Sequence, residues 1–274
     1  MIKKVKEILK YRQLIGTLVV RELKARYRGT VLGFLWSFIN PLMMLLVYSV
    51  VFGLFLRSGP QRVEGVDIAG FNYSIFLFTG LLPWIWFNTS VLEASQVLFT
   101  HGNLIKKIKF PVEVLPIMTV TSNMIHFLLG LPILVLCIIL LSSGITITPW
   151  VLLLPVAILL QYIFTLGFSL IMSALTVHFK DLKDIMTNLL ILWFFGTPII
   201  YPLATDVVQK HDWARIILNL NPMTHIVEAY QYIFFFGQLP HWKKIPVTFV
   251  FSTVLLILGY ALFDKLRDTF VEEV

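Results

Sequence analysis

The sequence predicts an all-α polytopic membrane protein with six transmembrane helices. Hydrophobic residues make up 58% of the chain and charged residues only 14%, whereas soluble domains carry about 25% charged residues. The mean hydropathy is +0.84. Apolar windows of about 20 residues recur from one end to the other. Because they leave no room for a globular insert, we expect one transmembrane domain over residues 1–274, with a cytoplasmic interface helix (1–30), a six-span bundle (31–263) and a cytoplasmic tail (264–274).

Six segments have the length and hydropathy of a transmembrane helix. The first thirty residues are charged throughout and lack a signal-peptide pattern, so we expect the first segment to remain as an anchor. Pro83 falls near the middle of the second segment, where a proline loosens the helix. The predicted spans are Val31–Leu56, Phe71–Leu92, Val114–Leu141, Trp150–Val177, Ile185–Leu203 and Ile245–Phe263.

Lysines and arginines set the expected orientation, because positively charged loops are retained in the cytoplasm. With both ends of the chain inside the cell, sixteen of the 22 lysines and arginines fall on the cytoplasmic side and six on the external side. We therefore expect a multi-pass protein whose N- and C-terminal ends are both cytoplasmic.

The residues before the first span have the spacing of a helix that lies in the membrane interface. Between residues 14 and 29, apolar side chains recur every four residues and predict one stripe: Ile15, Val19, Leu23 and Tyr27. Glu22 and Arg26 stand four residues apart and can pair. The cations of this segment either fix topology and bind anionic lipid, or bind the phosphate of a substrate headgroup. These headgroup candidates are Arg21, Lys24, Arg26 and Arg28.

The chain lacks the residues that would let it power transport or catalyse a reaction by itself. Secondary transporters need buried carboxylates or a relay, but the predicted spans contain no Asp, Glu, Lys or Arg, and His126 is more typical of an interhelical hydrogen bond. We find no phosphate-binding loop, no catalytic pair and no metal-ligand cluster. We therefore expect no cofactor or metal in this chain, and its energy must come from a partner.

Two short cytoplasmic connections can receive such a partner. Between the second and third spans, "EASQVLFTHGNLIKKIKFPVEV" places apolar residues among lysines, and between the fourth and fifth "HFKDLKD" alternates in charge. Both can equally be solvated loops whose lysines fix topology. The candidate contacts are Val97, Leu98, Leu104, Lys106 and Phe110 in the first connection, and Lys180, Asp181 and Asp184 in the second.

Motifs along nearly the whole chain resemble one family of transport proteins. "RELKARYRGTVLGFLWSFINPL" resembles the N-terminal signature of type-2 permease subunits in ATP-binding-cassette (ABC) exporters of polysaccharides, the group that covers O-antigen, capsule and teichoic acid export. The likeness continues in order through "GLLPWIWF", "GNLIKKIKFPVEVLPI", "HFKDLKDI", "FFGTPIIYPL" and "NPMTHIVEAYQ". No single motif therefore has to carry the identification.

This resemblance implies a homodimer in the bacterial inner membrane that works with two copies of a separate ATPase, which binds ATP and magnesium. It implies outward export of a polysaccharide linked to polyprenyl pyrophosphate, with no role for nucleic acid. The two connections, Val97–Phe110 and His178–Ile185, become coupling helices, and the N-terminal helix flanks substrate entry. The channel forms either between protomers or within each protomer.

Aromatic residues make up 14% of the chain and suit a sugar path, because rings stack on the C–H faces of sugars and let a polymer slide. Rings near the ends of spans equally form the ordinary interfacial belt. The first and fifth spans are our candidates for the channel walls. The candidate lining residues are Tyr48, Phe52, Trp84, Trp86, Phe87, Trp193, Phe194, Phe195 and Tyr201.

The last external connection, Pro202–Lys244, is long and largely apolar. A break at Asn221 and Pro222 predicts two short helices that dip back toward the membrane. From the residues alone, these helices can pack at the interface without a further role. The resemblance implies instead a gate at the outer end of the channel, with Glu228 or the rings around Tyr230 as its candidate lining.

Two other functions stay open. A type-2 permease for a drug or a smaller lipid would have a channel too narrow or too apolar for a sugar chain. A membrane-embedded glycosyltransferase or acyltransferase would need a catalytic carboxylate or histidine at one rim of the membrane, and the sequence offers no convincing constellation.

Overall fold

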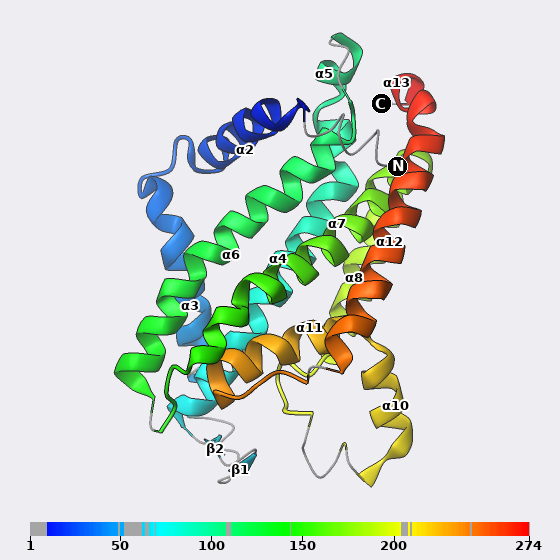
Figure 1. Ribbon diagram of the computed structural model, residues 1–274. Helices are drawn as coiled ribbons and strands as arrows, with labels where there is room; N and C mark the ends of the chain where they lie inside the picture. The colour runs from blue at the N-terminus through cyan, green and yellow to red at the C-terminus, as the bar shows by residue number, and fades with distance from the viewer. Residues whose placement is uncertain are drawn as a thin grey trace.

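The computed structural model describes residues 10–48, 50–51, 62–63, 66–68, 70–107, 111–142, 144–203, 208, 210–241 and 243–273 (Figure 1). Most of these residues are helical. One antiparallel pair of two-residue strands, β1 (Arg62–Val63) and β2 (Val66–Asp67), accompanies the helices. The predicted class, a helical membrane protein, is confirmed for the part of the chain that the structure describes.

Four helices in the described residues are long and apolar enough to cross a membrane. Helix α4 (Phe71–Thr100) extends past the predicted end of the second span, and α6 (Val114–Leu141) has the predicted bounds. Helix α7 (Leu154–His178) follows a 3₁₀ turn, η3 (Pro149–Leu153), and α12 (Lys244–Leu266) covers the last predicted span. The second, third, fourth and sixth spans are therefore confirmed as long apolar helices.

The first and fifth predicted spans correspond to shorter helices. Helix α3 (Trp36–Tyr48), which follows the 3₁₀ turn η1 (Gly33–Leu35), has 13 residues, and α8 (Leu182–Phe195) has 14. Each is roughly 20 Å long, whereas the hydrocarbon core of a bilayer is about 30 Å thick. Residues 52–56 of the first predicted span lie outside the described residues.

The fifth span was predicted to continue to Leu203, and this boundary is wrong for a helix. Helix α8 ends at Phe195, and the chain from Gly196 to Leu203 is not helical. Pro198 and Pro202 supply no N–H for a helical hydrogen bond, which disfavours a helix through this segment.

Helix α4 lies at the centre of the bundle and packs against α6, α7, α8 and α11 (Pro222–Gln231) (Figure 1). Helices α7 and α12 also pack closely, at two glycines. A Cβ on Gly167 would lie 2.7 Å from the nitrogen of Leu256, and one on Gly259 would lie 2.5 Å from the carbonyl oxygen of Gly167. Only glycine allows the two backbones to approach so closely.

The two ends of the bundle differ in what covers them. Helices α2 (Arg12–Tyr27), α5 (Gly102–Lys107) and α13 (Phe270–Glu273), the last preceded by the 3₁₀ turn η5 (Arg267–Thr269), lie at one end (Figure 1). A hydrophobic core joins α2, α4, α5, α6, α7, α12 and α13 there. The strands and α10 (Asp212–Leu220) lie at the opposite end.

The predicted break at Asn221 and Pro222 is confirmed. It separates α10 from α11 (Pro222–Gln231), which continues into a π-helical turn, η4 (Tyr232–Phe236). Helix α11 is largely buried and packs against α4, α7 and α12. Helix α10 instead exposes an apolar stripe along one side: Trp213, Ile216, Ile217 and Leu220.

Two side-chain amides bind backbone carbonyls that have no helical partner because α8 ends at Phe195. The Nδ2 atom of Asn221 donates to the carbonyl of Gly196 over 2.8 Å, while its Oδ1 accepts from the indole nitrogen of Trp193 over 2.9 Å. The Nε2 atom of Gln231 donates to the carbonyl of Pro198 over 2.8 Å. Because apolar surroundings cannot satisfy backbone groups, these bonds make the non-helical segment tolerable inside the protein.

Candidate functional site

A large groove lies between α3, α4 and α6. Its volume is about 830 Å³, within the range of about 300–1,000 Å³ that is common for ligand pockets. The C-terminal end of α2 covers one end of the groove. Apolar and aromatic side chains dominate its wall, with a few polar groups between them. The lining residues used below are Arg26, Tyr27, Trp86, Asn123, His126 and Phe127.

The predicted stripe of α2 determines which cations face the groove. Leu18 and Val19 are buried in the core at this end of the bundle, with 8% and 5% of their surface exposed. This contact turns Arg26 inward. Arg21, Lys24 and Arg28, in contrast, are exposed. The four predicted headgroup cations therefore divide into three exposed side chains and one that is engaged by the bundle.

Arg26, Glu93 and Asn123 form a closed cluster, which we call the Arg26 cluster. The Nη2 atom of Arg26 donates to Oε1 of Glu93 over 2.7 Å, and its Nη1 donates to Oδ1 of Asn123 over 3.1 Å. The Nδ2 atom of Asn123 donates to Oε2 of Glu93 over 2.7 Å. Arg26 thus pairs with Glu93 on α4, although the sequence suggested Glu22 on its own helix.

A second polar group lies beside this cluster. Ser37 donates a hydrogen bond of 2.8 Å to the hydroxyl of Tyr27, which lies 3.3 Å from Nδ1 of His126. The rings of Tyr27 and His126 also meet edge to face, with their centroids 5.7 Å apart. His126 therefore joins the end of α2 to α6, in line with the expected interhelical hydrogen bond.

A smaller pocket lies on the other side of the Arg26 cluster. Its volume is about 360 Å³, and residues of α2, α4 and α6 line it, including Glu22, Gln96 and Thr100. Arg26 lines both cavities. We call this smaller space the outer pocket and the larger one the groove.

The predicted channel-lining residues do not share one surface. Trp86 lines the groove, and its ring stacks on that of Phe127 with centroids 5.1 Å apart. Trp84 and Phe87 are buried, with 5% and 0% exposed, in an aromatic cluster that includes Trp193.

Two of the remaining channel candidates, Phe194 and Phe195, lie on α8, and Tyr201 follows it. Phe194 packs against Trp84, while 59% of Phe195 is exposed. The hydroxyl of Tyr201 donates to the carbonyl of Phe195. Phe52 and the side chain of Tyr48 lie outside the described residues.

The predicted contacts for the partner include both buried and exposed side chains. Val97 and Leu98 are buried in the core beneath α5, and Leu104 is half-buried. Lys106 is exposed, and Phe110 lies outside the described residues.

Lys180 and Asp181 are exposed in the turn between α7 and α8, and Asp184 is exposed in the first turn of α8. Phe179 lies within the predicted coupling segment His178–Ile185 but was not among its candidate contacts, and 65% of its surface is exposed in this turn. An aromatic residue inside a charged turn was the signal that could have identified it.

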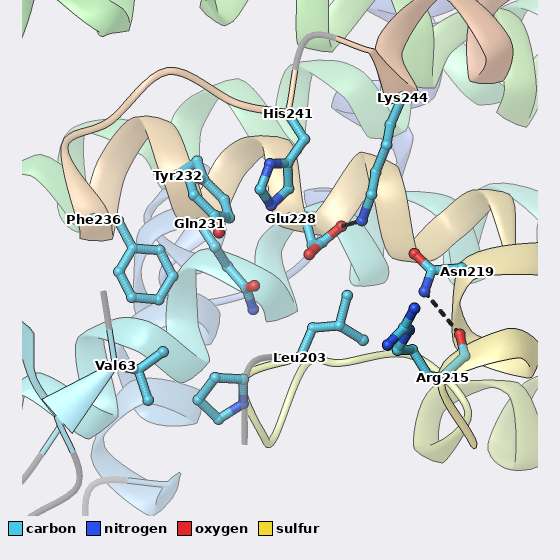
Figure 2. Close-up of a pocket in the computed structure, with 11 residues that line it drawn as sticks. Val63, Leu203, Arg215, Asn219, Glu228, Gln231, Tyr232, Phe236, His241 and Lys244 are labelled. Atoms are coloured by element: carbon cyan, nitrogen blue, oxygen red, sulfur yellow. Dashed lines mark hydrogen bonds and ion pairs between the residues drawn. The ribbon is translucent and has the colours of Figure 1, made fainter. Parts of the chain in front are cut away.

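The opposite end of the bundle carries a pocket of about 250 Å³ around Glu228 (Figure 2). The carboxylate of Glu228 accepts from Nζ of Lys244 over 3.0 Å, and Nδ1 of His225 lies 3.7 Å from the same oxygen. Burial raises the pKa of the Glu228 carboxyl, but His225 and the charge of Lys244 outweigh burial and hold that pKa below its ordinary value. Tyr230, the other gate candidate, is buried with 1% exposed and packs against Phe127, a residue of the groove wall.

Sequence reasoning also missed the role of Glu93 and Asn123. Glu93 directly follows the predicted second span, and Asn123 lies inside the third. A carboxylate within a turn of a span end and an amide inside a span were the signals available, but their meeting with Arg26 depends on how three helices pack.

Comparison with known proteins covers the whole chain. Residues 13–235 match the family model described as ABC-2 type transporter. An O-antigen export system permease of Myxococcus xanthus is 40% identical over 278 residues, covering 100% of both chains, and one of Klebsiella pneumoniae is 32% identical over 94% of both. A polysialic acid transport protein of Escherichia coli is 26% identical over 91% of this chain and 92% of its own.

Proposed function

The chain belongs to the ABC-2 type transporter family, and on this premise we propose that it is the membrane-channel subunit of an ATP-driven exporter of lipid-linked polysaccharide. It is a multi-pass inner-membrane transport subunit, and in this family a separate partner hydrolyses ATP. The substrate that we propose is an O-antigen-like glycan on polyprenyl pyrophosphate, moved outward from the cytoplasm. The names of the relatives, permeases of O-antigen export and a polysialic acid transport protein, support this substrate class.

One observation carries the substrate assignment. The groove, of about 830 Å³, has an aromatic and apolar wall but ends at α2, where the cations gather. A lipid-linked glycan presents a pyrophosphate between a long apolar chain and a sugar chain. Arg21, Lys24 and Arg28 are exposed on and just after the helix that covers this end of the groove, and they can receive the pyrophosphate, while rings such as Trp86 in the groove wall can receive sugar faces.

The proposed assembly is a homodimer with two copies of the ATPase, which binds ATP and magnesium. Exposed residues of the turn between α7 and α8, together with Lys106 of α5, form the proposed contact with the ATPase. We propose a single domain of six spans with both ends cytoplasmic, in which α3 and α8 supply the two shorter crossings. We also propose that α10 and α11 act as the external gate, with Glu228 at its pocket.

The experiment that tests this function reconstitutes the permease and its cognate ATPase in lipid nanodiscs. We expect a polyprenyl pyrophosphate carrying a short glycan to stimulate ATP hydrolysis, and an uncharged polyprenol to have no effect. Arg21→Gln combined with Arg28→Gln should lower the stimulation, while Arg12→Gln, an exposed cation at the other end of α2, should not. Stimulation by a drug or a small lipid alone would favour a different type-2 permease, and glycan transfer without ATP would indicate a membrane enzyme.

A further inference from the structure

We propose that the Arg26 cluster is a latch that the anionic headgroup of the substrate opens. In the closed state Arg26 is held by Glu93 and Asn123. When phosphate oxygens take the place of the Glu93 carboxylate on Arg26, the outer pocket and the groove become continuous and the end of α4 is released. The identity of the headgroup rests on the proposed function, but the latch itself rests on the contacts described here.

The order of residues along two helices places the cluster between the two cavities. On α4, the groove is lined up to Thr89 and the outer pocket begins at Glu93. On α6, which contributes to the same cavities, the outer pocket is lined by Thr119 and the groove begins at Asn123. Since Arg26 borders both spaces, its guanidinium and the two partners form the partition.

The chemistry of the cluster allows a phosphate to compete. The guanidinium of Arg26 makes one hydrogen bond to the carboxylate and one to the amide, so a bidentate phosphate contact would use donors that are already in place. A pyrophosphate carries more negative charge and more acceptor oxygens than a carboxylate. The side chains of Arg26 and Glu93 are 26% and 37% exposed, so the pair is accessible from the cavities.

The latch also connects the headgroup to the predicted ATPase contact. Glu93 lies one turn before Val97 on α4, and Val97 packs in the same core as Val19 of α2 and Ile105 of α5. Loss of the contact between α2 and α4 therefore changes the support beneath α5. Through this path, occupancy of the headgroup site can alter the rate of ATP hydrolysis.

The test measures ATP hydrolysis by the intact permease–ATPase complex in nanodiscs of phosphatidylcholine, with four additions: none, phosphatidylglycerol, uncharged polyprenol, or polyprenyl pyrophosphate bearing one N-acetylglucosamine. We expect Glu93→Gln to raise the basal rate at least about fivefold, the low end of typical coupling between sites. It should also lower the concentration of pyrophosphate lipid that gives half of the maximal rate. Arg26→Gln should raise the basal rate as well, but abolish the response to pyrophosphate.

This opposite effect on the headgroup response distinguishes a latch from an ion pair that only supports α2. A purely structural pair would make both variants lose basal rate and response together, and that result overturns the proposal. Arg12→Gln and Asp268→Asn change exposed charges at the same end of the molecule and should leave the basal rate unchanged. Glu93→Asp, which keeps the charge but shortens the reach, should give an intermediate basal rate and provides the same test if the Gln variant does not assemble.

Different measurements in this experiment test the latch and the proposed function. The basal rate of Glu93→Gln tests the latch without any substrate, and an unchanged rate overturns it. The response of the unmodified complex to the pyrophosphate lipid tests the proposed function, and its absence would contradict that function alone. A full response to phosphatidylglycerol would show that a bilayer headgroup opens the latch, and would overturn its assignment to the substrate.

Discussion

At the scale of single residues, Asn221 has a larger structural role than its place at the junction of α10 and α11 suggests. Its side chain caps α11 by accepting from the nitrogen of Met223 over 3.0 Å, and it also binds the carbonyl of Gly196 at the end of α8. One amide therefore holds two helix ends that are distant in sequence.

We expect Asn221→Ala to destabilise the protein by about 1–3 kcal/mol, because the carbonyl of Gly196 and the indole N–H of Trp193 lose their partner inside the protein. Thermal unfolding of the purified permease in detergent measures this loss. Asn219→Ala is the matched control, since the side chain of Asn219 donates to the carbonyl of Arg215 within its own helix, α10. Equal losses in the two variants would contradict the role assigned to Asn221.

The ion pair between Glu228 and Lys244 should make stability depend on pH. The pKa of Glu228 is below its ordinary value of 4.5. The carboxylate therefore stabilises the folded state above about pH 4.5, and this contribution is lost as the pH falls through the lowered pKa. We expect Glu228→Gln to cost about 1–3 kcal/mol at neutral pH and the difference from the unmodified protein to shrink in acid. A difference that grows as the pH falls would contradict this sign.

Residue roles were predictable from the sequence only where they depend on one segment. The stripe of α2 was predicted from its own spacing, and burial of Val19 agrees with it. Arg26 was predicted to bind a headgroup because it is an arginine beside a span, but its pairing depends on Glu93 and Asn123. No local pattern relates those three positions, so only the packing of the helices reveals the cluster.

At the scale of elements, the contact between α7 and α12 depends on two glycines. We expect Gly259→Val to destabilise the bundle by about 1–3 kcal/mol or more, because its side chain would meet the backbone of Gly167. Gly16→Ala is the control, since nothing lies within 4 Å of the added carbon in α2, and alanine should be neutral or slightly stabilising there. Thermal unfolding and the yield of folded permease measure both effects. An unchanged unfolding temperature in Gly259→Val would show that the helices can separate without loss.

The turn between α7 and α8 should contribute its binding energy to the ATPase through Phe179. Aromatic residues, including Phe, are enriched at protein–protein interfaces, and the few residues that a partner fully buries carry most of the binding energy. We expect Phe179→Ala to weaken the affinity for the ATPase by about 2 kcal/mol, or roughly 30-fold, without altering folding. Phe71 is also an exposed phenylalanine, but it lies at the start of α4, at the other end of the bundle, so Phe71→Ala should bind the ATPase normally. If the two variants bind the ATPase equally well, Phe179 is not part of the contact.

Helix boundaries were predictable where one physical cause acts along the chain. The bounds of α6 were predicted correctly because its sequence is continuously apolar, and Pro222 correctly indicated the start of α11. The end of α8 was placed too late, because hydropathy continues through Gly196–Leu203 while the backbone does not remain helical. Hydropathy reports burial in an apolar environment, and here side chains such as Asn221 and Gln231 make such burial possible without a helix.

At the scale of the whole molecule, the number of membrane crossings depends on α8. Helix α8 is too short to cross a bilayer alone, but the segment Gly196–Leu203 extends its path and its carbonyls are bound by Asn221 and Gln231. The combined path is long enough if the segment is buried in protein at membrane depth. The proposed six-span arrangement would therefore place the turn after α7 and the start of α10 on opposite sides of the membrane.

Single cysteines can test this arrangement, because Cys137 is the chain's one cysteine and can be replaced by alanine. We expect a membrane-impermeant maleimide added to spheroplasts to label cysteines introduced at the exposed positions Thr146 and Asp212, but to label one at Asp181 only after the membrane is opened. Asp268→Cys should behave as Asp181→Cys, because only α12 crosses between Asp212 and Asp268. If Asp212→Cys were protected together with Asp181→Cys, α8 would not cross, the chain would have five spans or fewer, and the external pocket around Glu228 would face the cytoplasm.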